Sequence, residues 1–406
     1  MFDNAIFLLQ IAVIIGFSRA VAWGFGKFGQ PQVVGEMAAG IMLGPTLFGL
    51  FAPGAYHALF PPASLGFLNA LSQTGLVVFI FIVGVRVDFA ELKRDSGVAI
   101  VTSNISVIVP LAMGIALAQY LYPTYGSGSR LVFALFVGTA MSVTAFPVLA
   151  RILMERNLVN TRLGSVAIAC AAVGDITAWV LLAALIAMKN RDQNARPFWM
   201  MLLFLAGYIG IMIAAGRALR AWSRRLDERN LPVGAMVMFI VLALLSGAAA
   251  EWIGVHALVG AFIAGLITPR QFRPQLIEKL ETAMLLLLIP LFFALTGLRT
   301  NLLFSTGGGA YLDFLLVLMV AILSKWGGSL LGARATGMSW RDASQLGLMM
   351  NTRGLVELIV LNVGLESGIL SGTLFSMMVL MALVTTFMAT PLMDWSSGEK
   401  KLRVAA

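Results

Sequence analysis

The chain has 406 residues, of which 59% are hydrophobic and 12% are charged, and its mean hydropathy is +0.91. Soluble domains are typically about half apolar and about a quarter charged, so this composition excludes a soluble globular protein. In a membrane protein the net charge of +9 reflects loop charges rather than a nucleic-acid-binding surface, and we expect no nucleic acid partner.

Continuous apolar runs predict an all-α polytopic membrane protein, because crossing a hydrocarbon core of about 30 Å takes roughly 20 helical residues. Such runs do not fit the short alternating strands of a transmembrane barrel. In chain order the thirteen predicted spans are 5–23, 32–50, 64–85, 97–120, 131–153, 163–188, 198–219, 231–250, 255–268, 282–298, 309–333, 342–364 and 371–393.

The loop charges predict the orientation of the chain. With the N-terminus outside, about twenty of the 28 Lys and Arg residues, Arg151 among them, fall in cytoplasmic connections, and about five fall on the other side. The positive-inside bias therefore predicts a cell-membrane protein with its C-terminus in the cytoplasm. The transmembrane domain covers 1–394, and 395–406 form a short cytoplasmic tail.

Two motifs of the first half recur in the second half. The glycine motif at 35–45 parallels 260–269, and the motif at 83–88 parallels 296–301. Small-residue spacings also recur by chance in packed membrane helices, but both matches are seven helices apart, and an odd offset reverses direction through the membrane. We therefore predict an inverted repeat, typical of secondary transporters, of helices 1–6 (about 5–188) and 8–13 (about 231–393), with helix 7 (about 198–219) as linker.

Four ionisable residues lie deep within predicted spans: Asp175, Lys325, Arg353 and Glu357. A charge at the bilayer centre costs at least about 2.5–3.5 kcal/mol, so each needs a partner, a water path or an ion. Asp175 is either a paired structural residue or a carboxylate that alternately holds a proton and a cation; we favour the second. Lys325 is either an ion-pair partner or a proton carrier. Arg353 and Glu357, four residues apart, fit a structural ion pair, whereas Glu36 is interpreted as an interfacial or packing residue.

Two predicted spans contain helix breakers. Pro147 follows Ser142 and Thr144 in the fifth span, and Asn351 and Thr352 precede Arg353-Gly354 in the twelfth. Irregular backbone at this depth is tolerated where it lines a polar cavity, and interrupted helices in corresponding halves indicate an ion site. The sequence contains no phosphate-binding loop, metal-ligand cluster or nucleophile–base arrangement, so we expect no enzymatic activity and no cofactor.

Four motifs together resemble the monovalent cation:proton antiporters, in the branch of the potassium efflux systems and the plant and bacterial cation/proton exchangers. They lie at 35–45, 142–151, 174–179 and 351–362. The resemblance implies a mobile core, a dimerising scaffold, and unwound fifth and twelfth helices that cross beside the sixth. It assigns ion binding to Asp175, the basic residue of the eleventh helix to Lys325, crossing-helix ligation to Thr144, and a charged pair to Arg353 and Glu357.

The residue before Asp175 departs from the family pattern. Members usually have Asp there, associated with electrogenic exchange, or Asn, associated with electroneutral exchange, whereas this chain has Gly174. A single titrating acid favours one proton per cation unless Lys325 also releases its proton. We therefore expect electroneutral exchange of Na⁺ or K⁺ for H⁺ by a homodimer, with Asp175 as the shared site. The alternatives are a channel-like regulated K⁺ efflux pathway and a sodium-coupled symporter on a similar fold.

Overall fold

Hydrophobic helices make up nearly all of the described chain, which in this computed structural model comprises residues 4–86, 96–189, 198–224, 232–298 and 310–397. These residues contain no β-strand, apart from an isolated bridge between Gly126 and Leu370. The first-half helices are α1 (Asn4–Lys27), α2 (Gln32–Leu43), α3 (Phe48–Phe51), α4 (Pro53–Leu59), α5 (Pro62–Arg86), α7 (Ser96–Tyr125), α8 (Arg130–Ser142), α9 (Phe146–Glu155), α10 (Arg162–Lys189) and α11 (Phe198–Ser223). The second-half helices are α12 (Val233–Ile253), α13 (Ala257–Ile267), α14 (Arg273–Ala283), α15 (Ile289–Leu298), α16 (Ala310–Ala335), α17 (Trp340–Met350), α18 (Leu355–Glu366) and α19 (Gly372–Ser397).

The predicted all-α membrane fold is confirmed. Within the described ranges, ten segments are long and apolar enough to cross a bilayer, and the apolar α13 is shorter, with 11 residues. Each of the thirteen predicted spans contains a helix or a pair of helices, while the number of crossings stays a prediction. Helix α19 continues to Ser397, three residues into the predicted tail, and the rest of that tail lies outside the described residues.

The fifth and twelfth spans are interrupted where the breakers predict. Helix α8 ends at Ser142 and α9 begins at Phe146, so Pro147 lies in the first turn of α9, where its missing N–H leaves no intrahelical bond unmade. Helix α17 ends at Met350 and α18 begins at Leu355. The two breaks touch, because the backbone N–H of Ala145 donates to the carbonyl of Thr352 at 3.0 Å.

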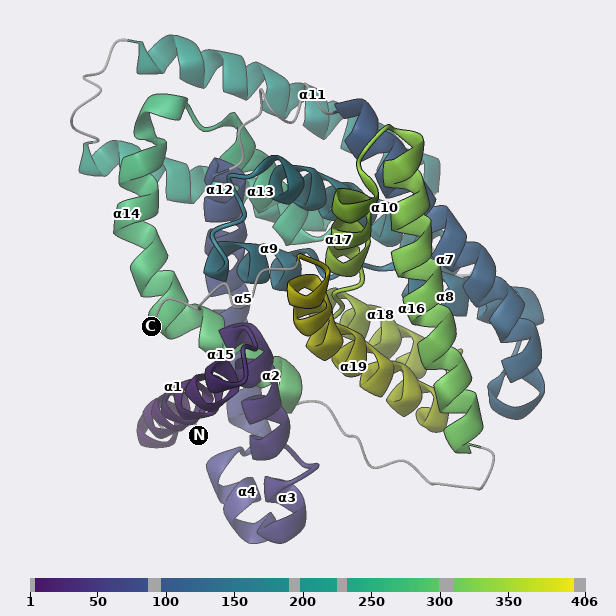
Figure 1. Cartoon of the computed structure of the whole chain (residues 1–406). Coiled ribbons are helices and arrows are strands. Elements are labelled where there is room, and N and C mark those ends of the chain that lie inside the picture. Colours follow the sequence, from purple (N-terminus) through teal and green to yellow (C-terminus); the bar gives the residue numbers. More distant parts are fainter. Residues whose placement is uncertain (1–3, 87–95, 190–197, 225–231, 299–309, 398–406) are drawn as a thin grey trace.

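The helices form two bundles (Figure 1). We call α1–α5 and α11–α15 the scaffold bundle, and α7–α10 and α16–α19 the core bundle. In the scaffold bundle α2 packs on α1 and α15, and α13 packs on α5 and α12; in the core bundle α7 packs on α8 and α16. Helix α9 lies at the boundary, where it contacts α2 and α5 on one side and α10 and α18 on the other.

Two glycines of the recurring motif allow close helix contacts in the scaffold bundle. A Cβ at Gly40 of α2 would lie 1.9 Å from the carbonyl oxygen of Ala294 in α15, and a Cβ at Gly265 of α13 would lie 2.2 Å from that of Phe81 in α5. Only a residue without a side chain lets backbones approach this closely. The matched glycines therefore join matched pairs of helices, the second to the tenth and the ninth to the third.

Candidate functional site

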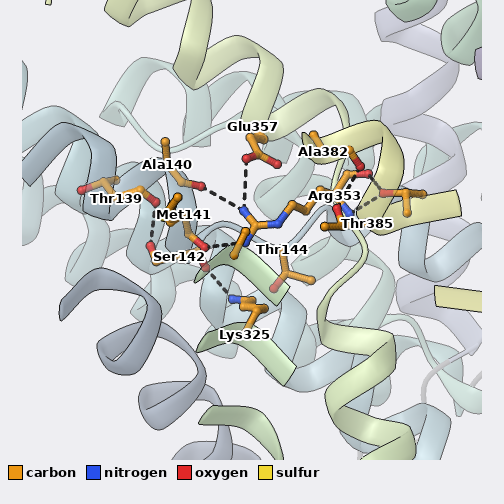
Figure 2. Close-up of polar contacts among 12 residues, drawn as sticks. Thr139, Ala140, Met141, Ser142, Thr144, Lys325, Arg353, Glu357, Ala382 and Thr385 are labelled. Carbon is orange, nitrogen blue, oxygen red and sulfur yellow. Dashed lines mark hydrogen bonds and ion pairs between the residues drawn. The ribbon is translucent and has the colours of Figure 1, made fainter. Parts of the chain in front are cut away.

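The buried guanidinium of Arg353 holds the crossing of the two breaks together (Figure 2). It has no exposed surface, and Nη1 donates to Glu357 Oε1 at 3.1 Å, one turn later in α18. Nη2 donates to the carbonyl of Met141 at 2.9 Å, and Nη1 makes a longer contact of 3.4 Å to that of Ala140. The predicted ion pair is thus present, and it also ties α18 to the last turn of α8.

A second buried cation, Lys325 of α16, reaches the same end of α8. Its Nζ donates to the carbonyl of Ser142, the last residue of α8, and to that of Ser106 in α7 at 3.0 Å. Helix carbonyl ends carry partial negative charge and unpaired acceptors, so they favour cations. Two cations therefore occupy the carbonyls that the break in the fifth span releases.

Asp175 lies on α10 and is 1% exposed. Its Oδ1 is buried without a hydrogen-bond partner in the part of the chain that the structure describes, and its charge interacts with that of Lys325. A carboxylate oxygen without a donor is a free ligand for a proton or a cation. At the preceding position, a Cβ on Gly174 would meet no atom within 4 Å, so this position has room for a side chain.

The breaks themselves supply buried oxygen atoms. The Thr144 hydroxyl donates to the carbonyl of Met350 at 3.1 Å, and the Thr352 hydroxyl donates to that of Met349 at 2.8 Å. Asn351 Oδ1 is buried and has no partner among the described residues. Hydroxyl, amide and carboxylate oxygens at discontinuous helices are the donor types that bind alkali cations in transporters.

Most of the predicted site residues therefore lie at the contact between the two breaks, but the side chains of Pro147 and Ser142 contribute nothing to its polar contacts. Pro147 lies in the first turn of α9 and takes no part in the polar contacts. The Ser142 hydroxyl donates to the Thr139 carbonyl at 2.7 Å, so Ser142 contributes only its backbone carbonyl, which accepts from Lys325. Sequence reasoning missed Thr386 of α19, whose hydroxyl accepts from the Arg353 N–H at 2.8 Å and donates to the Arg353 carbonyl at 2.6 Å. No local pattern marks this threonine, because its partner is 33 residues away.

Arg151 and Glu36 belong to a second group of buried charges, and the assignment of Arg151 to a loop was wrong. Arg151 was counted among the loop bases, but it lies within α9, is buried, and pairs with Glu155 one turn later. Glu36, interpreted as an interfacial or packing residue, is fully buried beside Arg19 and Arg151. The spacing of four between Arg151 and Glu155, the same as between Arg353 and Glu357, was the available signal.

Comparisons with known proteins identify the family of this chain. The transmembrane family of sodium/hydrogen exchangers matches residues 12–395. The chain belongs to this family. It is 40% identical over 392 residues to the Na(+)/H(+) antiporter NhaS4 of Synechocystis sp., and the match covers 95% of each protein.

Other exchanger relatives are longer or more distant. The chain is 34% identical to the K(+)/H(+) antiporter 1 of Saccharomyces cerevisiae over 95% of its own length, but it spans only 46% of the yeast protein. The solved structure of the sodium proton antiporter MjNhaP1 from Methanocaldococcus jannaschii at pH 8 superimposes with a TM-score of 0.69 at 13% identity, covering 98% of this chain and 100% of that one. The predicted family and its all-helical antiporter fold are confirmed, and the chain is a multi-pass membrane transporter.

Proposed function

We propose that this exchanger carries Na⁺ or K⁺ in one direction and H⁺ in the other, with Asp175 as the site that both ions share. The observation that carries the proposal is the buried Asp175 Oδ1 without a hydrogen-bond partner in the described chain, within electrostatic range of Lys325. Deprotonated Asp175 binds the cation together with Thr144 and oxygens of the crossing, and protonation displaces it. Competition for one carboxylate is sufficient to couple the two flows.

Alternating access, in which the core bundle moves against the scaffold bundle, is supported by two apolar cavities of about 270 Å³ between the bundles. One cavity lies between α13 and α10 and the other between α2 and α19. Each is lined by residues at the same four sequence positions relative to its matched glycine, Gly260 in α13 and Gly35 in α2. The residues at these positions are Val259, Phe262, Ile263 and Leu266 in the first cavity and Val34, Met37, Ala38 and Ile41 in the second, where Phe25 of α1 adds to the scaffold-side lining. This correspondence favours an inverted repeat, which brings the same gap between the bundles to opposite sides of the membrane.

Electroneutral exchange is the stoichiometry that we propose. Gly174 adds no second carboxylate, so Asp175 is the only acid of its helix that can exchange one proton for one cation. Lys325 is fixed by two carbonyl acceptors, which favour its role as a charged partner of the helix end rather than as a second proton carrier. We also propose a homodimer in the cell membrane with its N-terminus outside and its C-terminus in the cytoplasm.

Proton flux in liposomes tests the shared site. Purified protein is reconstituted with an internal pH dye, a pH gradient is imposed, and Na⁺ or K⁺ is added outside. We expect the wild type to dissipate the gradient and Asp175→Asn to match protein-free liposomes. The matched control is Asp313→Asn, because Asp313 lies on α16 of the same bundle and accepts hydrogen bonds from Tyr120 and Tyr125 instead of facing the crossing.

The same assay, run with and without a clamped membrane potential, tests the stoichiometry. One-for-one exchange predicts equal rates in the two conditions, whereas unequal charge movement makes the rate depend on the clamp.

For the shared site, equal dissipation of the pH gradient by the wild type and by Asp175→Asn would show that Asp175 is not the site that both ions share.

A further inference from the structure

A second group of buried charges lies where α2 of the scaffold bundle meets α9 of the core bundle. Glu36 of α2 has no exposed surface, and neither of its carboxylate oxygens has a hydrogen-bond partner among the described residues. Its Oε1 lies 3.8 Å from a guanidinium nitrogen of Arg19 in α1 and 3.8 Å from one of Arg151 in α9. A buried carboxylate that accepts no hydrogen bond depends on these two cations to remain charged.

The two arginines belong to different bundles. Arg151 Nε lies 2.7 Å from Glu155 Oε1 on the same helix, so this pair stays together wherever α9 goes. Arg19 donates to Gln32 Oε1 at 2.9 Å and belongs to the scaffold bundle, as Glu36 does. In this group, the contacts that join the bundles include the ion pair of Arg151 with Glu36, a longer hydrogen bond of 3.4 Å from Arg151 to Gln32 Oε1, and the hydrogen bond from the Gln32 N–H to Glu155 Oε2 at 2.7 Å.

Among the described residues, the second half has no acid at the position that matches Glu36. The motif match places Ala261 of α13 where Glu36 stands in α2, and Ala261 is fully buried. In a carrier whose two halves otherwise correspond, a charge on one side makes the two arrangements of the bundles unequal in energy. Glu36 lies on the side of the membrane that the loop charges predict to be cytoplasmic.

We propose that Glu36 is a second proton-binding site of the exchanger, whose ionisation follows the position of α9. This inference rests on the proposed movement of the core bundle. With α9 in place, Arg151 stabilises the Glu36 carboxylate. When α9 carries Arg151 and Glu155 away together, Glu36 keeps Arg19 alone, and the carboxylate, which has lost one of its two cations, takes up a proton to become the neutral acid.

The charged groups around Glu36 support this sign of the effect. Arg19 faces it from α1, and Arg151 and Glu155 face it from α9; α3 and α15, which also pack on α2, carry no charged residue. When α9 moves away, Glu36 therefore loses Arg151, one of its two neighbouring cations. It also loses Glu155, whose electrostatic effect on Glu36 is smaller than that of Arg151. Protons favour the separated arrangement, and high pH favours the arrangement in this structure.

Distances between spin labels across the boundary test the proposal without relying on transport. The free Cys170 is replaced by Ala, and labels are placed at the exposed Phe28, between α1 and α2, and the exposed Asn160, between α9 and α10. A proton bound in one arrangement only shifts the equilibrium by up to about tenfold per pH unit. We expect a longer distance to grow in as the pH falls, and Glu36→Gln to remove this pH dependence.

Two further variants make the test decisive. Glu281→Gln is the matched control, because Glu281 pairs with Arg86 inside the scaffold bundle, and it should behave as the wild type. The double variant Arg151→Gln/Glu155→Gln removes the moving charges as a neutral pair and should abolish the pH dependence even if Glu36→Gln fails to fold. The proposal would be overturned if the distance in the wild type did not change with pH. It would also be overturned if the pH dependence were retained in Glu36→Gln or in the double variant. Since the labels report arrangement rather than flux, such a result is distinct from the failure of Asp175 as the transport site.

Discussion

Replacing Arg353 tests whether the crossing depends on its buried ion pair. Arg353→Met leaves the Glu357 carboxylate buried without its cation and removes the donor from the Met141 carbonyl. Glu357→Met leaves Arg353 with its carbonyl acceptors, and the double variant leaves no unpaired charge. We therefore expect the order of stability to be wild type, then the double variant, then Arg353→Met.

The magnitude follows from the burial of both partners, which have no exposed surface. Breaking a buried pair by removing one partner costs about 3–5 kcal/mol, which lowers the ratio of folded to unfolded protein by about two to three and a half powers of ten. Arg130→Met is the matched control, since Arg130 is exposed at the start of α8, the helix whose carbonyl end Arg353 binds, and it should cost about 1 kcal/mol or less.

Reversible unfolding in mixed micelles of mild detergent and dodecyl sulfate measures these free energies, with helix content as the signal. The double-mutant cycle isolates the coupling between Arg353 and Glu357. If Arg353→Met costs no more than Arg130→Met, or if the two single losses add in the double variant, the pair does not stabilise the crossing. A transport defect in Arg353→Met would then have to arise from the ion pathway itself.

Three other substitutions give separate tests. Gly40→Ala should lower the yield of monodisperse protein, because its Cβ would meet the Ala294 carbonyl at 1.9 Å, whereas Gly16→Ala meets no atom within 4 Å and should leave the yield unchanged; equal yields would contradict the packing argument. Gly174→Asp should fold normally, since the space around Gly174 is open, and should make the flux in liposomes depend on membrane potential; a flux that stays independent of potential would refute a stoichiometric role for this position. Lys325→Met leaves two buried carbonyls without a donor and should cost about 1–3 kcal/mol per acceptor in the same unfolding assay, and a loss well below this range would mean that water replaces the ammonium.

The local features of the fold were predictable from the sequence because they rest on short-range rules. Apolar runs of about 20 residues predict the helices, and Pro147 and the polar stretch from Asn351 predict the two breaks, since each removes or competes for helix hydrogen bonds. The spacing of four also predicts the contact between Arg353 and Glu357, although in the structure Arg353 lies in the break before α18 and only Glu357 is helical.

The contacts between distant helices were not predictable in the same way. Glu36 gains its cations from α1 and α9, and nothing in the residues next to it specifies either partner. Arg151 was assigned to a predicted loop. Its burial became visible only in the structure, where α9 continues past it to Glu155. Thr386 likewise contacts Arg353 through the packing of α19, which hydropathy does not determine.

The attachment of α8 to both α16 and α18 has a consequence for ion selectivity. Because Lys325 and Arg353 bind the carbonyl end of α8 from two directions, the crossing is braced within the core bundle rather than formed between the bundles. Under the proposed movement of the core bundle, an ion site at the crossing would move as one unit and present the same ligand spacing to each side of the membrane. The preference for Na⁺ over K⁺, or the reverse, should therefore be identical for inward and outward gradients.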